Sequence, residues 1–155
     1  MTKEEKYIAS TREIEIRLER GGDLIADLGN IAAVLKKRLD FFWVGFYFFR
    51  ENHLVLGPFQ GTPACVFLAI AKGVCGTCAQ KKETILVPDV ALFPGHVACD
   101  PNSKSEIVIP LFDQSGSLRG VLDADSDALN AFDDVDKIHL EKIGKLIEPC
   151  WDEGR

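Results

Sequence analysis

Hydrophobic positions in the first forty residues recur at spacings of three and four, which is typical of amphipathic helices. The first stripe ends at the Gly21-Gly22 pair and consists of Tyr7, Thr11, Ile14 and Leu18. The second begins after Asp23, an expected N-cap, and consists of Leu24, Leu28, Ile31 and Leu35. The pattern therefore predicts two consecutive helices, and a similar apolar face from about Asp133 onward predicts a closing helix.

The hydrophobic pattern changes at residue 41, where apolar, aromatic and β-branched residues gather in short runs. A short helix is expected in "GVCGTCAQKKE", between the third and fourth of these runs. The predicted strands are "FFWVGFYFF", "LVLGPF", "CVFLAIAKG", "TILVP", "EIVIPLF" and "SLRGVLDAD". Because strands and helices do not alternate regularly, we expect an α+β fold with a central, largely antiparallel sheet and helices packed on one face.

A stretch without periodicity, residues 88–104, interrupts this order with three prolines and a glycine. Long loops of this kind inside a domain are often functional, so we expect an active-site or binding loop here. Cys99 lies in it, with His96 three positions before and Asp100 directly after. An imidazolium lowers a thiol pKa and a carboxylate opposes that shift. The local sequence therefore leaves open whether Cys99 is inert or a nucleophile.

Length and charge narrow the classes of function. The chain has 155 residues, of which 46% are hydrophobic and 27% charged, so we expect a single globular domain over residues 1–155. A net charge of −6 argues against nucleic-acid and anionic-membrane partners. The charged N-terminal segment has no apolar core typical of a secretory signal, and the longest uncharged apolar run, 41–49, is too short to cross a bilayer. We expect a cytoplasmic protein.

Five cysteines in such a protein should be mostly reduced, which leaves metal binding, redox cycling or burial as their roles. Cys75 and Cys78 form a Cys-x-x-Cys pair, but the βαβ context of a thioredoxin-like dithiol is missing. Together with His96 and Cys99 they could also bind zinc tetrahedrally. The apolar content is sufficient for folding without a metal, so we expect neither a metal nor a cofactor.

Acidic residues near the ends of two predicted strands are further candidates. On one strand, Asp123 and Asp125 share a face about 7 Å apart, and we expect them at its exposed end. Paired carboxylates suit an ammonium group, a hard cation or a proton donor with a raised pKa. Solvated acids that cap the last helix are the alternative. Glu106 lies just after the Cys99 loop, where a glutamate is usually exposed.

Two aromatic residues of the first predicted strand, Trp43 and Tyr47, are four positions apart and therefore share one face. Aromatic strand residues are more often part of a core than of a ligand pocket. Taken alone, this pair predicts packing and no particular function.

The order of several motifs between Trp43 and Ser126 resembles one family. "WVGFY", "LVLGPFQGTPACV", "GVCG", "GHVACD", "SEIVIP" and "GVLDADS" are similar to the free methionine-R-sulfoxide reductases, which are single GAF-domain enzymes. The resemblance covers more than half of the chain. It implies a GAF fold and the reduction of free methionine-R-sulfoxide, with thioredoxin or a similar dithiol reductant as partner.

The resemblance also implies a role for each candidate residue. Cys99 would be the attacking cysteine, Cys65 the resolving cysteine and Cys75 an auxiliary cysteine, whereas Cys78 departs from the common pattern and leaves the resolving partner open. The implied substrate-binding residues are Trp43, Tyr47, Glu106, Asp123 and Asp125.

Two other classes of function stay open from the sequence. One is a GAF-type module that binds a small ligand or senses redox state without catalysis, and the other is a zinc-stabilised interaction domain. The oligomeric state is not determined, so a homodimer is also an open alternative.

Overall fold

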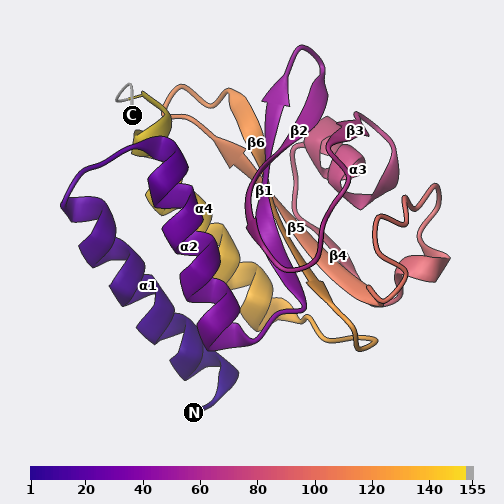
Figure 1. The fold of residues 1–155 in the computed structure, drawn as a ribbon, viewed down its shortest axis with the longest axis horizontal. Coiled ribbons are helices and arrows are strands. Elements are labelled where there is room, and N and C mark those ends of the chain that lie inside the picture. The colour runs from indigo at the N-terminus through magenta and orange to yellow at the C-terminus, as the bar shows by residue number, and fades with distance from the viewer. Residues whose placement is uncertain (153–155) are drawn as a thin grey trace.

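The computed structural model describes residues 1–152 and contains one six-stranded antiparallel sheet in the order β3-β2-β1-β6-β5-β4 (Figure 1). The predicted α+β class and the antiparallel sheet are confirmed. In chain order, the elements are α1 (Lys3–Glu19), α2 (Leu24–Leu39), β1 (Trp43–Arg50), β2 (His53–Gln60), β3 (Phe67–Ala69), α3 (Gly73–Lys81), β4 (Ile85–Val87), the 3-10 helix η1 (Val90–Leu92), β5 (Ser105–Phe112), β6 (Leu118–Ser126) and α4 (Asp134–Asp152).

The first hairpin of the sheet, β1–β2, turns through Glu51 and Asn52. Both residues have positive φ, +47° and +65°, and Arg50 pairs directly with His53. Two consecutive left-handed residues match the right-handed twist of the flanking strands, which is why two-residue hairpin turns adopt this geometry. The hairpin predicted from the apolar runs is confirmed.

The alternation of side chains along β1 separates two hydrophobic layers. Val44 and Phe46 join the core between the sheet and helices α2 and α4, whereas Trp43 and Tyr47 face the opposite side. Figure 1 shows α2 and α4 against the sheet with α1 outside them, and α3 beyond the other face. The expected packing of helices on one face therefore holds for α2 and α4, but α3 packs on the opposite face and helps to cover the site.

Buried polar contacts anchor the N-terminal helix α1. The hydroxyl of Tyr7 donates to the Asp136 carboxylate of α4 at 2.6 Å, and Lys3 Nζ is 2.7 Å from the same carboxylate. At the start of α2, the Asp23 carboxylate accepts hydrogen bonds from the backbone N–H groups of Ile25 and Ala26, which confirms the predicted N-cap. These contacts stabilise the helical layer, on the opposite face of the sheet from Trp43 and Tyr47.

The loop that contains Cys99 is more ordered than its sequence predicts. Val90–Leu92 form η1, and the Val90 backbone N–H donates to the Lys104 carbonyl at 2.9 Å, which brings the two ends of the loop together. This order depends on contacts between residues far apart in the chain, because the segment itself has no hydrophobic periodicity. Within residues 1–152, no helix has the length and apolar character needed to cross a membrane.

Candidate active site

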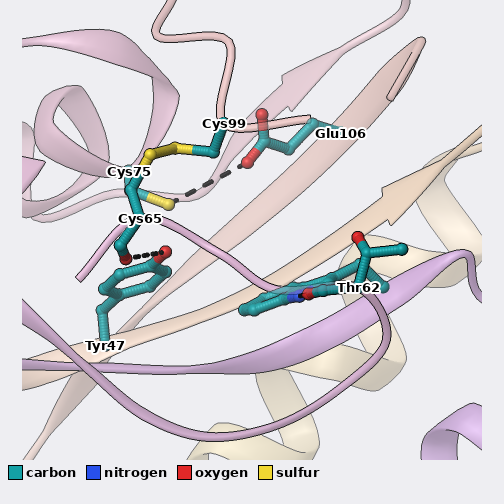
Figure 2. Close-up of a disulfide and its surroundings, with 7 residues drawn as sticks. Tyr47, Thr62, Cys65, Cys75, Cys99 and Glu106 are labelled. Carbon is teal, nitrogen blue, oxygen red and sulfur yellow. Dashed lines mark hydrogen bonds between the residues drawn. A yellow bond between two sulfur atoms is a disulfide. The ribbon is translucent and has the colours of Figure 1, made fainter. Parts of the chain in front are cut away.

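Two segments far apart in sequence meet at a disulfide between Cys65 and Cys99 (Figure 2). Cys65 lies two residues before the edge strand β3, and Cys99 lies in the loop between η1 and β5. The two Cα atoms are 5.5 Å apart although 34 positions separate the residues. The structure therefore brings together the two cysteines to which the sequence resemblance assigned attack and resolution.

The aromatic side chains of β1 hold the Cys65 segment in place. The hydroxyl of Tyr47 donates to the Cys65 carbonyl at 2.9 Å, and the indole N–H of Trp43 donates to the Thr62 carbonyl at 3.0 Å. The ring of Trp43 also stacks on Phe59, with centroids 5.3 Å apart. The predicted shared face of Trp43 and Tyr47 is confirmed, and that face forms one wall of the site.

The acidic side chains come from the two central strands β5 and β6. Glu106 pairs across the ladder with Asp125, and Val108 pairs with Asp123. All three acids are buried: Glu106 is 7% exposed, Asp123 is 6% exposed and Asp125 is 9% exposed. The expectation that Asp123 and Asp125 lie at an exposed strand end is wrong, and so is the exposed position expected for Glu106. The reason is that β6 lies between β1 and β5, while α3 and the cysteine loops cover this face.

Burial of these acids changes their protonation. Burial raises the pKa of Glu106, and Asp123 beside it adds to the shift. Burial likewise raises the pKa of Asp123, with a further contribution from Asp125, and the pKa of Asp125 rises from burial and from Glu106. Like charges so close together are costly without water, so the cluster retains protons that separate carboxylates would release.

The two cysteines of α3 lie outside the disulfide and have different surroundings. The thiol of Cys75 donates to Glu106, with a sulfur–oxygen distance of 3.9 Å. Burial is the main cause that raises the pKa of Cys75, and the nearby charge of Asp123 adds to it. The thiol of Cys78 is fully buried and donates to the Val108 carbonyl at 3.6 Å. The open question of the disulfide partner is thus answered in favour of Cys65 in this state of the protein.

The zinc set considered from the sequence is not assembled. The sulfur of Cys99 is bonded to Cys65, and Cys78 is directed toward β5. Among residues 1–152, the group of potential metal ligands with mutually close donor atoms is instead Cys75, Glu106 and Asp123. Spacing along the chain could not reveal this set, because it comes from one helix and two strands.

The two titratable neighbours of Cys99 along the chain, His96 and Asp100, both have shifted pKa values. Burial lowers the pKa of His96, so its imidazole is neutral near pH 7 and supplies no positive charge to a thiolate. The Asp100 carboxylate accepts hydrogen bonds from the Asn102 backbone N–H at 2.8 Å and from the Thr62 hydroxyl at 2.7 Å, and both lower its pKa. The sequence predicted no role for Thr62, although this residue lies in the "GTPACV" segment, three residues before Cys65.

Most of these groups line one pocket, which is partly open to solvent. Its walls combine Trp43, Cys99 and the three acids, and they also include Lys72 and Ser103, for which the sequence predicted no role. A disulfide-bonded cysteine, buried carboxyls with raised pKa values and an aromatic surface therefore meet at one pocket.

Comparison with known proteins assigns this architecture to a family. The GAF domain profile matches residues 23–149. The chain is 51% identical over 148 residues to GAF domain-containing protein A of Dictyostelium discoideum, covering 95% of this chain and 93% of the relative. It is 40% identical over 149 residues to the free methionine-R-sulfoxide reductase of Escherichia coli, covering 96% and 90%.

A solved structure agrees with these sequence relatives. The free methionine-R-sulfoxide reductase of Neisseria meningitidis in complex with its substrate superposes with a TM-score of 0.96 at 41% identity, covering 100% of this chain and 93% of that one. Such identity over nearly the full length extends far beyond the cysteine motifs. The chain therefore belongs to the GAF-domain family and, within it, to the free methionine-R-sulfoxide reductases.

Proposed function

We propose that this protein reduces free methionine-R-sulfoxide to methionine, working as one domain, with Cys99 as nucleophile and Cys65 as resolving thiol. The observation that carries the proposal is the Cys65–Cys99 disulfide at the wall of a pocket that also contains Glu106, Asp123 and Asp125. The full-length similarity to reductases with this named activity supports it.

The proposed cycle uses the thiols in turn. The Cys99 thiolate attacks the sulfoxide sulfur while the sulfoxide oxygen takes a proton. The resulting hydroxyl group then moves from the substrate sulfur to the Cys99 sulfur as the new sulfur–sulfur bond breaks, which releases methionine and leaves a sulfenic acid on Cys99. The Cys65 thiol then condenses with the sulfenic acid, which forms the disulfide and releases water. In sum, one sulfoxide and two thiols give one thioether, one disulfide and one water.

The acid cluster would serve both protonation and recognition. Carboxyls whose pKa values are raised by burial can donate a proton to the sulfoxide oxygen. Those that ionise can pair with the free ammonium group of the substrate, which a peptide-bound methionine sulfoxide lacks. Trp43 would hold the methyl group and help to select the R stereoisomer. Cys75, which donates to Glu106, would act as an auxiliary thiol.

The disulfide must be reopened for each turnover, so the proposal includes a dithiol reductant such as thioredoxin. Such a cycle fits a protein of the cytoplasm, because dithiol reductants are kept reduced in that compartment. Assembly as a homodimer is compatible with the proposal and is tested by mass measurement in solution.

The decisive experiment is a thioredoxin-coupled assay with free R, free S and peptide-bound methionine sulfoxide. We expect turnover of the free R form and loss of that turnover in Cys99→Ser. The control is Cys78→Ala, which removes a buried thiol that donates to the Val108 carbonyl and lies outside the disulfide. Absence of turnover, or full turnover by Cys99→Ser, would overturn the proposal. Tight binding of a small ligand without consumption of reductant would instead favour the ligand-binding or redox-sensing class.

A further inference from the structure

Three side chains in the pocket bring metal-ligating atoms together from three elements. The Cys75 sulfur of α3 and one carboxylate oxygen each of Glu106 on β5 and Asp123 on β6 lie within 4.8 Å of one another. All three residues are buried, and the sulfur of Cys75 is 3.9 Å from Glu106 Oε2 (Figure 2). This grouping persists with the Cys65–Cys99 disulfide closed, so it does not depend on the redox-active sulfurs.

One of the three residues, Asp123, has a carboxylate oxygen without a partner. Asp123 is 6% exposed, and its Oδ1 atom is buried without a hydrogen bond. Within residues 1–152, no ion pair joins a basic side chain to Glu106 or Asp123. A buried carboxylate oxygen without a donor is unfavourable, so the pocket has unmet capacity for a positively charged ligand.

We infer that the pocket binds a thiophilic divalent cation such as Zn²⁺ through Cys75, Glu106 and Asp123. One thiolate and two carboxylates are a ligand set that zinc accepts, and the pocket leaves the fourth position of a tetrahedral ion to solvent or substrate. At the usual zinc–ligand distances, a tetrahedral ion holds sulfur and oxygen about 3.6 Å apart. The 3.9 Å between Cys75 and Glu106 is close to this value.

This ion would act as an inhibitor of the proposed reductase. It would occupy Glu106 and Asp123, which the proposed function assigns to protonation and to the substrate ammonium, and that part of the inference rests on the proposed function.

The binding site is tested on the oxidised protein with cadmium chloride alone, because cadmium thiolates absorb in the ultraviolet. With the disulfide closed, we expect saturable charge-transfer absorption in the wild type and in Cys78→Ala, and none in Cys75→Ala. The two variants are matched, since both thiols are buried on α3 and both lose the same atoms. Absence of absorption in the wild type, or its retention in Cys75→Ala, would overturn the inference.

A carboxylate variant provides a second test that does not depend on removing the thiol. Asp123→Asn keeps the shape of the side chain, and we expect the affinity for cadmium to fall by about tenfold or more. Circular dichroism checks that each variant is folded. Unchanged affinity in a folded Asp123→Asn protein would overturn the assignment of this carboxylate as a ligand.

The inhibitory role is measured separately. Zinc chloride should inhibit turnover of free methionine-R-sulfoxide in competition with the substrate, while the same thioredoxin system reduces a small disulfide reagent at an unchanged rate. Cadmium binding without any inhibition would overturn the inhibitory role. Failure of the reductase assay itself would overturn the proposed function and leave the cadmium result standing.

Discussion

The Thr62 hydroxyl donates a 2.7 Å hydrogen bond to Oδ2 of Asp100 and so joins the two cysteine segments a second time, beside their disulfide. Thr62 is three residues before Cys65, and Asp100 directly follows Cys99. Unlike the disulfide, this bond does not require oxidised sulfur. It can therefore hold the segments near one another when both cysteines are reduced, which raises the effective concentration of one thiol at the other.

Thr62→Val removes this hydroxyl and should weaken closure of the disulfide. We expect the equilibrium between the Cys65–Cys99 disulfide and glutathione to shift toward the dithiol by roughly three- to tenfold, the usual net effect of one intramolecular hydrogen bond. The equilibrium is measured by alkylation and mass spectrometry in defined glutathione mixtures. Thr62→Ser keeps a hydroxyl and should behave like the wild type. An unchanged equilibrium in Thr62→Val would contradict this role.

The acid cluster should reduce stability as the pH rises. Because burial and Asp125 raise the pKa of Asp123 in the folded state, the unfolded chain binds fewer protons between its own pKa, about 3.9, and the raised value. The free energy of unfolding then decreases with pH in this window. Asp123→Asn should raise Tm at pH 8 by roughly 2–4 °C, the shift that about 1 kcal/mol causes in a chain of this size. The gain should disappear near pH 4.

Asp113 provides a control of opposite sign. Hydrogen bonds from Ser115 lower its pKa, so its stabilising effect is present above the unfolded pKa and is lost as the pH falls through the folded value. Asp113→Asn should lower Tm at pH 7 and lose its effect in acid. Both variants are measured by thermal unfolding across the same pH series, and parallel curves for the two would contradict the argument.

The extra thiol at position 78 should not disturb the redox cycle. Cys78 is fully buried and donates to the Val108 carbonyl, so it is not available to the sulfenic acid of Cys99. Peptide mapping under non-reducing conditions after one turnover should show the Cys65–Cys99 bond in both the wild type and Cys78→Ala. Any bond that includes Cys78 would show that α3 moves during the cycle.

The close approach of β1 to β2 at Gly45 should be necessary for the position of Trp43. A Cβ atom at Gly45 would overlap the Phe59 side chain and come within 2.8 Å of Trp43 Cη2. Gly45→Ala should therefore cost about 1–3 kcal/mol in the free energy of unfolding and raise KM more than it lowers kcat. Gly29→Ala on α2 meets no atom within 4 Å and should instead stabilise the helix slightly. Thermal unfolding and steady-state kinetics compare the two.

The pattern of the sequence predicted most of the local structure. Helices α1 and α2, the β1–β2 hairpin and the closing helix follow from hydrophobic periodicity and turn residues, because these signals depend on neighbours along the chain. The shared face of Trp43 and Tyr47 followed from the two-residue period of a strand. The candidate cysteines and acids were recognised from the order of the motifs.

Only the tertiary structure decided how these residues meet and in which charge state. Glu106, Asp123 and Asp125 were expected at exposed positions, yet the central place of β6 and the cover of α3 remove them from water and raise their pKa values. The choice of Cys65 over Cys78 as partner of Cys99 likewise depends on chain segments that no sequence spacing relates. Periodicity specifies which face a residue occupies, whereas contacts between distant segments specify what that face touches.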